Sequence, residues 1–204
     1  MTSSPSETET TETAVHPLQE YADSVAEALG GEGEIHFDTI KVRVPADSWV
    51  EAHTTARDDL DLVFFSWLSA IDWSNQVEAG DPLDEEVDEH LELLTTLGDL
   101  TEGKRVTLST RLEKESPSIA SLVDIYAGAD WHEREAYEMF GIDFLGHPNL
   151  AHIYLPESFI GNPLRKSYPL LSREVKPWPG KVDVEAMPEK PDKPEEPSTE
   201  NPEA

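Results

Sequence analysis

The stretch from residue 131 to residue 169 constrains the fold of this chain more than any other part of its sequence. It begins as a charged, amphipathic helix whose start and end are both marked. Asp130 is placed as its cap, Glu133 follows three residues later as in a capping box, and Gly141 stands where a left-handed residue ends a helix. We therefore predict a helix over 131–140.

The side chains of this helix divide between an apolar and a charged surface. Ala136 and Phe140 share one face, which should pack against the rest of the fold. We expect Glu133 and Arg134 to point elsewhere. Arg134 and Glu138 are one turn apart, so the sequence predicts an ion pair between them.

The segment that follows the helix is too rich in glycine and proline for regular structure, and these residues recur throughout it: Gly141, Gly146, Pro148, Pro156, Gly161, Pro163 and Pro169. Buried backbone groups there still need hydrogen-bond partners. Either the surface of another protein supplies them, or the segment folds back on its own domain. A partner would also bury the apolar side chains of the segment: Leu150, Ile153, Leu155, Phe159 and Leu164.

A basic pair lies near the end of this segment. The chain has a formal net charge of −28, so the adjacent cations Arg165 and Lys166 stand out. They are candidate anchors for a carboxylate-rich patch on a partner, because arginine can bind a carboxylate with two hydrogen bonds. The alternative is an ordinary solvated pair.

The first half of the chain predicts helices and strands in alternation. Apolar spacing indicates a helix over about 17–29, stopped by Gly30 and Gly31. An extended run from Ile35 to Val44 changes its alternation near residues 38–39, which indicates a bend or a hairpin. Asp47 or Ser48 can cap a second helix, whose apolar stripe is Trp49, Ala52, Ala56 and Leu60.

Three further strands are expected before the helix at 131–140. Residues 62–73 are apolar on both faces, which favours a central strand. Residues 81–86 read as a loop and 89–97 as a strand, while 105–112 alternates cleanly, as a half-buried strand does. Ser121 is placed to cap a short helix. This order predicts an α/β (α+β) fold: a mixed or antiparallel sheet with flanking helices, followed by an extended irregular C-terminal segment.

Composition divides the chain into four parts. Its apolar fraction of 37% is below the ~45–50% of globular domains, and the deficit is at the ends. We expect a disordered acidic tail over 1–15, an α/β domain over 16–128, the helix with its irregular segment over 129–172, and a disordered Pro/Glu-rich tail over 173–204.

Charge and composition exclude several function classes. The net charge of −28 disfavours nucleic-acid binding and docking on an anionic bilayer. The count of zero cysteines excludes disulfides, thiolate zinc sites, a cysteine nucleophile and ordinary iron–sulfur ligation by this chain. No signal peptide and no membrane-spanning stretch is visible, so cytosolic residence is the default expectation.

Motifs for chemistry are weak. The sequence has no phosphate-binding glycine loop and no nucleophile elbow. One group of side chains is the best metal candidate: His132, Glu133, Glu135, Glu138, His147 and His152. Their spacing matches neither the HExxH pattern nor a di-iron bundle, so caps and salt bridges are the main alternative. A set of aromatic residues could line a quinone or flavin pocket, or serve as packing and interface anchors: Tyr137, Phe140, Phe144 and Tyr154.

The same stretch resembles the 30-kDa subunit family of respiratory complex I, NADH:quinone oxidoreductase, known in bacteria as the C subunit. The resemblance lies in Glu133-Arg134-Glu135-x-Tyr137-Glu138-Met139-Phe140-Gly141-Ile142-x-Phe144-x-Gly146-His147-Pro148-x-Leu150, in Ile153-Tyr154-Leu155-Pro156, and in Gly161-x-Pro163-Leu164-Arg165-Lys166-x-Tyr168-Pro169. His152 and Ser158 depart from it, where the family usually has Arg and Asp. A salt bridge at those two places is therefore in doubt.

The resemblance implies a non-catalytic peripheral-arm subunit on the cytoplasmic side of the bacterial cell membrane. It implies no cofactor in this chain, with FMN, iron–sulfur clusters and quinone in partner subunits. The implied partners are chiefly the 49-kDa (D) quinone-site subunit and the B and I iron–sulfur subunits. The expected interface residues are Glu133, Arg134, Glu135, Tyr137, Phe140, Gly141, Gly146, His147, Pro148, Arg165 and Lys166. Two alternatives are the equivalent module of a related membrane-bound hydrogenase and a free-standing His/Glu metalloenzyme.

Overall fold

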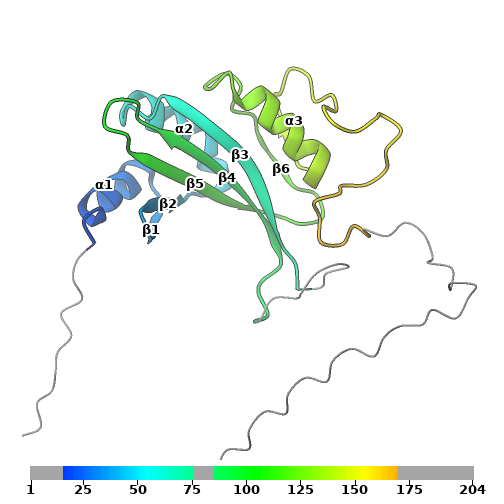
Figure 1. Cartoon of the computed structure of the whole chain (residues 1–204), viewed down its shortest axis with the longest axis horizontal. Helices are drawn as coiled ribbons and strands as arrows, with labels where there is room; N and C mark the ends of the chain where they lie inside the picture. Colours follow the sequence, from blue (N-terminus) through cyan, green and yellow to red (C-terminus); the bar gives the residue numbers. More distant parts are fainter. Residues whose placement is uncertain (1–15, 76–84, 170–204) are drawn as a thin grey trace, which may run out of the picture. The chain divides into compact units, whose positions relative to one another are not determined.

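The computed structural model describes residues 16–75 and 85–169, so both expected tails and the loop at 81–84 lie outside the described residues. Figure 1 shows the long strands β3 (Phe64–Trp73), β4 (His90–Gly98) and β5 (Arg105–Leu112) side by side, with the shorter β1 (Glu32–His36) and β2 (Thr39–Arg43) and the helix α1 (Gln19–Leu29) beyond β5. The combination of a mixed sheet with a few helices confirms the predicted fold class.

The main sheet has five strands in the order β1-β2-β5-β4-β3. β2 and β5 run parallel, and the other neighbours are antiparallel. The expected hairpin is present between β1 and β2, where Phe37 adopts a φ of 55°.

Three α-helices are present in the described ranges: α1 (Gln19–Leu29), α2 (Trp49–Asp58), preceded by the 3-10 turn η1 (Ala46–Ser48), and α3 (Ala129–Phe140). Gly30 and Gly141 end α1 and α3 with φ values of 64° and 71°, which confirms both predicted stops. The predicted side-chain caps are wrong. Neither α2 nor α3 has a cap bond from a side chain at its start, and Gly128 is the residue before α3.

Two strands sit elsewhere in the sheet than predicted. β3 is an edge strand rather than a central one. β5 is the middle strand, and its residues 106–110 are buried without a break, so it is not half-buried. The polar residues of this alternation include Thr107 and Ser109, whose small hydroxyl side chains are buried, and the Thr107 hydroxyl bonds that of Thr96 on β4.

The strand register assigns the helices to one face of the sheet. The ring of His53 on α2 bonds the hydroxyl of Thr95 on β4, so Thr95 faces the helices. Side chains two residues apart share a face. The helix face therefore carries the leucines Leu91, Leu93, Leu97 and Leu108, all with 0% exposure. The hydrophobic core continues from this face into α3 through Ala136 and Phe140.

A small second sheet joins the chain before α3 to the chain after it. β6 (Ser118–Ala120) and β7 (Asp143–Leu145) pair in parallel. Ser121 was predicted to cap a short helix, but residues 123–128 after it form turns instead. The segment after α3, yellow to orange in Figure 1, leaves β7 and curves back toward the sheet.

Candidate docking site

The C-terminus of α3 is closed by the segment that follows it. The last four carbonyl groups of a helix lack partners within the helix. Here Gly141 N–H donates to Tyr137 at 2.9 Å, and Leu164 N–H donates to Met139 at 3.1 Å. The other two carbonyls, of residues 138 and 140, accept from the side chains of Asn162 and Arg165. Residues 162–165 therefore cap three of the four terminal carbonyls, and Gly141 caps the fourth.

Glu138 and Arg134 both bind the backbone of the irregular segment. The carboxylate of Glu138 accepts the N–H groups of Ile153 at 3.0 Å, of Tyr154 at 3.1 Å and of Leu155. The guanidinium of Arg134 donates to the carbonyl oxygens of residues 151 and 152. The predicted Arg134–Glu138 ion pair is therefore wrong, because each side chain instead binds backbone groups of residues 151–155.

Burial and hydrogen bonding act in opposite directions on Glu138. Its exposed fraction is 2%, and burial alone would raise the pKa of its carboxyl group. The three backbone donors outweigh burial and lower the pKa below its ordinary value. The group is therefore an anion that holds residues 153–155 against α3.

Glu133 is inside the fold, not on a charged outer surface. Its exposed fraction is 0%, its carboxylate accepts the N–H of Leu122 at 2.6 Å, and it shares a 2.6 Å hydrogen bond with the hydroxyl of Ser121. It does not form the predicted capping box. Burial raises the pKa of its carboxyl to about 7, partly offset by these two hydrogen bonds.

His147 ties the turn after β7 to the start of α3. Its Nδ1 accepts the N–H of Asn149 at 3.0 Å, so the proton of the neutral ring is assigned to Nε2. That nitrogen lies 3.2 Å from the carbonyl oxygen of Asp130, to which it donates. It also lies 4.0 Å from the carboxylate of Glu133.

The basic pair binds this chain's own carbonyl groups. Arg165 donates to the carbonyl of Phe140 at the end of α3 and, at 3.0 Å, to that of Lys114. The Lys166 N–H donates to Asp72 at 2.8 Å, and its amine donates to the carbonyl of Ser74 at 3.3 Å. The segment thus folds back on its own domain, as one of the two alternatives expected, and its backbone pairs come from the chain itself.

The outer surface of the same region carries large apolar side chains. Five stand out by exposed fraction: Trp131 62%, Leu145 58%, Tyr154 64%, Ile160 89% and Leu164 53%. Of the five apolar residues singled out in the sequence, only Leu164 belongs to this set, and the other four are partly buried. No pattern in an irregular segment tells which apolar side chain faces outward.

The chemistry-bearing candidates do not come together. No group of three His, Asp or Glu side chains in the described ranges is placed to hold a metal ion. Glu133 and Glu138 bind separate stretches of backbone. Phe140 and Phe144 are core residues, whereas Tyr154 is exposed, so the aromatic set does not line one pocket.

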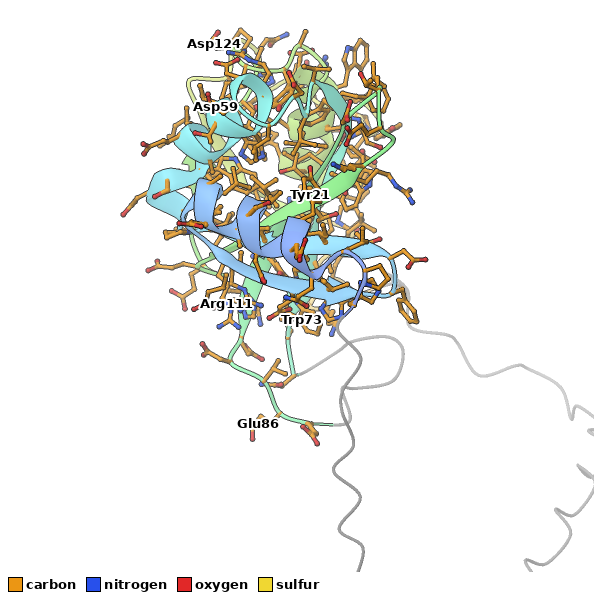
Figure 2. The ribbon with its side chains drawn as sticks, turned by 90° about the vertical axis from the view of Figure 1, so that its left-hand side faces the viewer. Tyr21, Asp59, Trp73, Glu86, Arg111 and Asp124 are labelled. Carbon is orange, nitrogen blue, oxygen red and sulfur yellow. The ribbon has the colours of Figure 1, made fainter. Side chains whose placement is uncertain are left out.

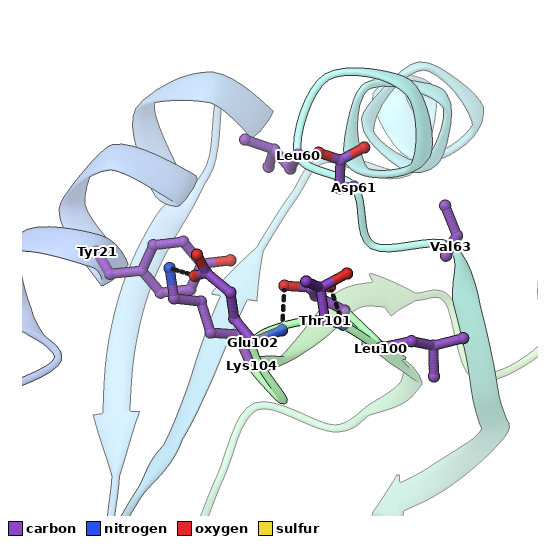
Figure 3. A pocket seen from close by; sticks show the side chains of 9 residues that line it. Tyr21, Leu60, Asp61, Val63, Leu100, Thr101, Glu102 and Lys104 are labelled. Atoms are coloured by element: carbon purple, nitrogen blue, oxygen red, sulfur yellow. Dashed lines mark hydrogen bonds and ion pairs between the residues drawn. The ribbon is translucent and has the colours of Figure 1, made fainter.

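A hollow of about 400 Å³ lies away from this region, beside the β4–β5 hairpin (Figure 3). Asp99 accepts the N–H groups of Thr101 and Glu102, as in a tight turn. The amine of Lys104 pairs with Glu102 and lies 4.3 Å from the centre of the Tyr21 ring. These polar groups bind one another, so the hollow is a feature of the hairpin.

Comparison with known proteins identifies the family. The family model described as "Respiratory-chain NADH dehydrogenase, 30 Kd subunit" matches residues 42–174, which is more than half of the chain. The chain belongs to this family. The match includes α3 and the irregular segment after it, so it covers the part of the sequence on which the resemblance rested.

Curated relatives of the 30-kDa subunit family carry the name of the C subunit of NADH-quinone oxidoreductase. The protein of Mycolicibacterium gilvum is 34% identical over 75% of this chain and 68% of its own length. That of Citrifermentans bemidjiense is 32% identical over 83% of this chain and 96% of its own length. A solved trypsin-resistant fragment of Nqo5 shares the fold, with a TM-score of 0.52, 24% identity, and coverage of 64% of this chain and 97% of the fragment.

This 30-kDa family member is thus a subunit of the NADH:quinone oxidoreductase complex. None of its helices within 16–75 and 85–169 has the length and apolar character needed to cross a bilayer.

Proposed function

We propose that this chain is a non-catalytic subunit of the peripheral arm, and that α3 with residues 141–169 docks it on neighbouring subunits. The proposed neighbours are the 49-kDa quinone-site subunit and the B and I iron–sulfur subunits, on the cytoplasmic side of the membrane. In this proposal the FMN, the iron–sulfur clusters and the quinone are held by partner subunits. The absence of cysteine from the sequence is consistent with that division.

The exposed apolar side chains of the docking region carry this proposal. An irregular backbone normally moves, but this one is tied to α3 by Glu138, Arg134 and Arg165. It therefore presents Tyr154, Ile160 and Leu164 in fixed positions, while the exposed Trp131 is held by α3 itself. Preorganised apolar side chains lose little entropy on binding, and clusters of them mark interaction surfaces.

The interface residues expected from the sequence divide into two groups under this proposal. Glu133, Phe140 and the side chain of His147 are buried in the chain and would act by shaping the surface. Others are at least partly accessible and could contact a partner directly: Arg134, Glu135, Tyr137, Gly141, Gly146, Pro148, Arg165 and Lys166.

The variant Ile160→Asp tests the proposal. Ile160 is 89% exposed, so the change should leave the isolated chain folded. A charge at an apolar contact costs about 1–3 kcal/mol, so incorporation into the complex should fall about fivefold or more on a native gel. The matched control is Phe37→Asp, which alters a 96% exposed apolar residue on the β1–β2 hairpin and should incorporate normally.

An Ile160→Asp chain that enters the complex as readily as the wild type would contradict docking through this surface. Arg165→Glu is a poorer test, because its carboxylate would face the carbonyl oxygens of Phe140 and Lys114 within the chain. Loss of incorporation by that variant would be explained equally by disruption of the irregular segment and by disruption of the interface.

A further inference from the structure

The sheet has a second face that no helix covers in the described residues. Register defines it: Trp67, Thr96, Thr107 and Lys41 form one row across the strands, and Ile71, Glu92 and Arg111 form another. These side chains alternate with those that face the helices. Trp67 and Ile71 on the edge strand β3 are 37% and 41% exposed, whereas Thr96, Thr107 and Glu92 on the same face are buried. We call it the open face because no described helix lies on it.

The β2–β5 half of this face is cationic. Lys41 pairs with the buried Glu92 at 2.6 Å. Arg43 reaches only one carboxylate, that of Glu34 at 3.9 Å, and its Nε has no acceptor in the described part of the chain. Arg111 is exposed and pairs with no described carboxylate. Among the described residues, the guanidinium groups of Arg43 and Arg111 therefore lack a close carboxylate partner, although the chain has a net charge of −28.

A hollow of about 220 Å³ lies between these cations and the end of β3. Its charged lining consists of Lys41, Arg43 and Arg111 with the carboxylates Asp88 and Glu92, and Trp73 also lines it. Figure 2 shows Trp73 and Arg111 at the same end of the molecule. The Trp73 ring stacks on that of His90, with centres 6.3 Å apart. The hollow thus presents the guanidinium groups of Arg43 and Arg111, which are hydrogen-bond donors, beside the flat ring of Trp73.

We propose that this open face binds an acidic segment of a neighbouring protein subunit, whose carboxylates contact Arg43 and Arg111 and whose apolar side chains cover Trp67 and Ile71. The inference rests on the proposed function, since it needs neighbouring subunits. Charge complementarity selects the occupant: arginine binds carboxylates in a bidentate manner. A nucleic acid would meet the same arginines but be repelled by the rest of the chain.

Photo-crosslinking within the native complex tests this surface. A benzophenone amino acid placed at residue 71 should crosslink, on irradiation, to a peptide of another subunit that is rich in Asp and Glu. Adding Arg111→Glu should lower the crosslink yield about tenfold, because charge complementarity is lost. Arg105→Glu is the matched control, since Arg105 is exposed at the other end of β5, and its yield should stay within about twofold of the unsubstituted chain.

Each result decides the question. Crosslinks only to this chain's own residues, to a segment without net negative charge, or to nothing in an assembled complex would overturn the proposal. Equal loss of yield with both arginine variants would do the same. A crosslink only to a protein outside the complex would also overturn the proposal. The native gel of the same sample reports separately whether the chain is incorporated, and so whether the proposed function itself fails.

Discussion

Two glutamates of α3 respond oppositely to burial. Glu133 has two hydrogen-bond donors, and burial raises its pKa to about 7. For Glu138 burial acts in the same direction, but three backbone donors dominate and lower its pKa. In the sequence both look like ordinary surface carboxylates of an acidic chain. Their roles depend on residues 121–122 and 153–155, which no helical spacing can identify.

Glu133 should make stability depend on pH. The folded chain keeps its proton up to about pH 7, whereas the unfolded chain releases it near 4.5, so folding takes up a proton between these values. This contribution to stability is therefore full at low pH and lost as the pH rises toward 7. Glu133→Gln mimics the protonated form and should become more stable than the wild type by about 2–3 kcal/mol above pH 7.

Denaturant unfolding of the two full chains at pH 4.5 and pH 7.5 measures this difference directly. Comparison with the wild type removes the opposite trend from carboxylates with lowered pKa, such as Glu138 and Glu92. A stability difference that stays constant across this range would contradict the assignment of a raised pKa to Glu133.

Glu138 should control local opening of the irregular segment. Glu138→Gln replaces one acceptor oxygen by an amide that faces backbone donors, at a cost of about 2 kcal/mol. Amide exchange of residues 153–155 should then accelerate roughly thirtyfold. Glu135→Gln on the same helix is the control, because no hydrogen bond of the Glu135 side chain to a described residue is present. Equal exchange in both variants would rule out the role given to Glu138.

At the scale of elements, the end of α3 is the best-defined feature and the one that sequence predicts best. Gly141 adopts a φ of 71°, and a Cβ there would lie 2.8 Å from the Asn162 amide oxygen. The sequence signals the glycine stop. It does not signal that residues 162–165 return to cap the helix, because that contact joins residues distant in the chain.

Substitution of two glycines separates backbone strain from this contact. Gly103 also has a φ of 71°, but nothing lies within 4 Å of the position of its Cβ. Gly103→Ala should cost about 1–2 kcal/mol from backbone strain alone. Gly141→Ala should cost more, by about 1–3 kcal/mol, because Asn162 must also move. The free energy of unfolding checks this, and equal losses would show that Asn162 does not restrict the helix end.

The predicted strands are present, but β3 and β5 differ from the prediction in their place in the sheet or in their burial. β3 was expected at the centre because both of its faces are apolar. One face packs on the core, while Trp67 and Ile71 lie on the open face. β5 was expected to be half-buried because hydroxyl side chains alternate with apolar ones, yet Ser109 is 0% exposed. An alternating sequence pattern shows which residues are polar. It does not show how many neighbouring side chains cover each of them.

At the scale of the whole molecule, five of the cations lie in the two proposed contact regions, although the net charge is −28. Arg134, Arg165 and Lys166 hold the irregular segment, and Arg43 and Arg111 line the open face. The family could be inferred from the sequence because its motif has fixed spacing. Which side chains face a partner could not, since that depends on the path of the irregular segment.

A structure of the purified native complex would show whether the docking region is covered by another subunit, through the accessible area of its side chains. We expect Trp131, Tyr154 and Ile160, all more than half exposed in the chain alone, to be buried against another subunit. A complex in which these three side chains face solvent, while the chain is held elsewhere, would contradict this expectation.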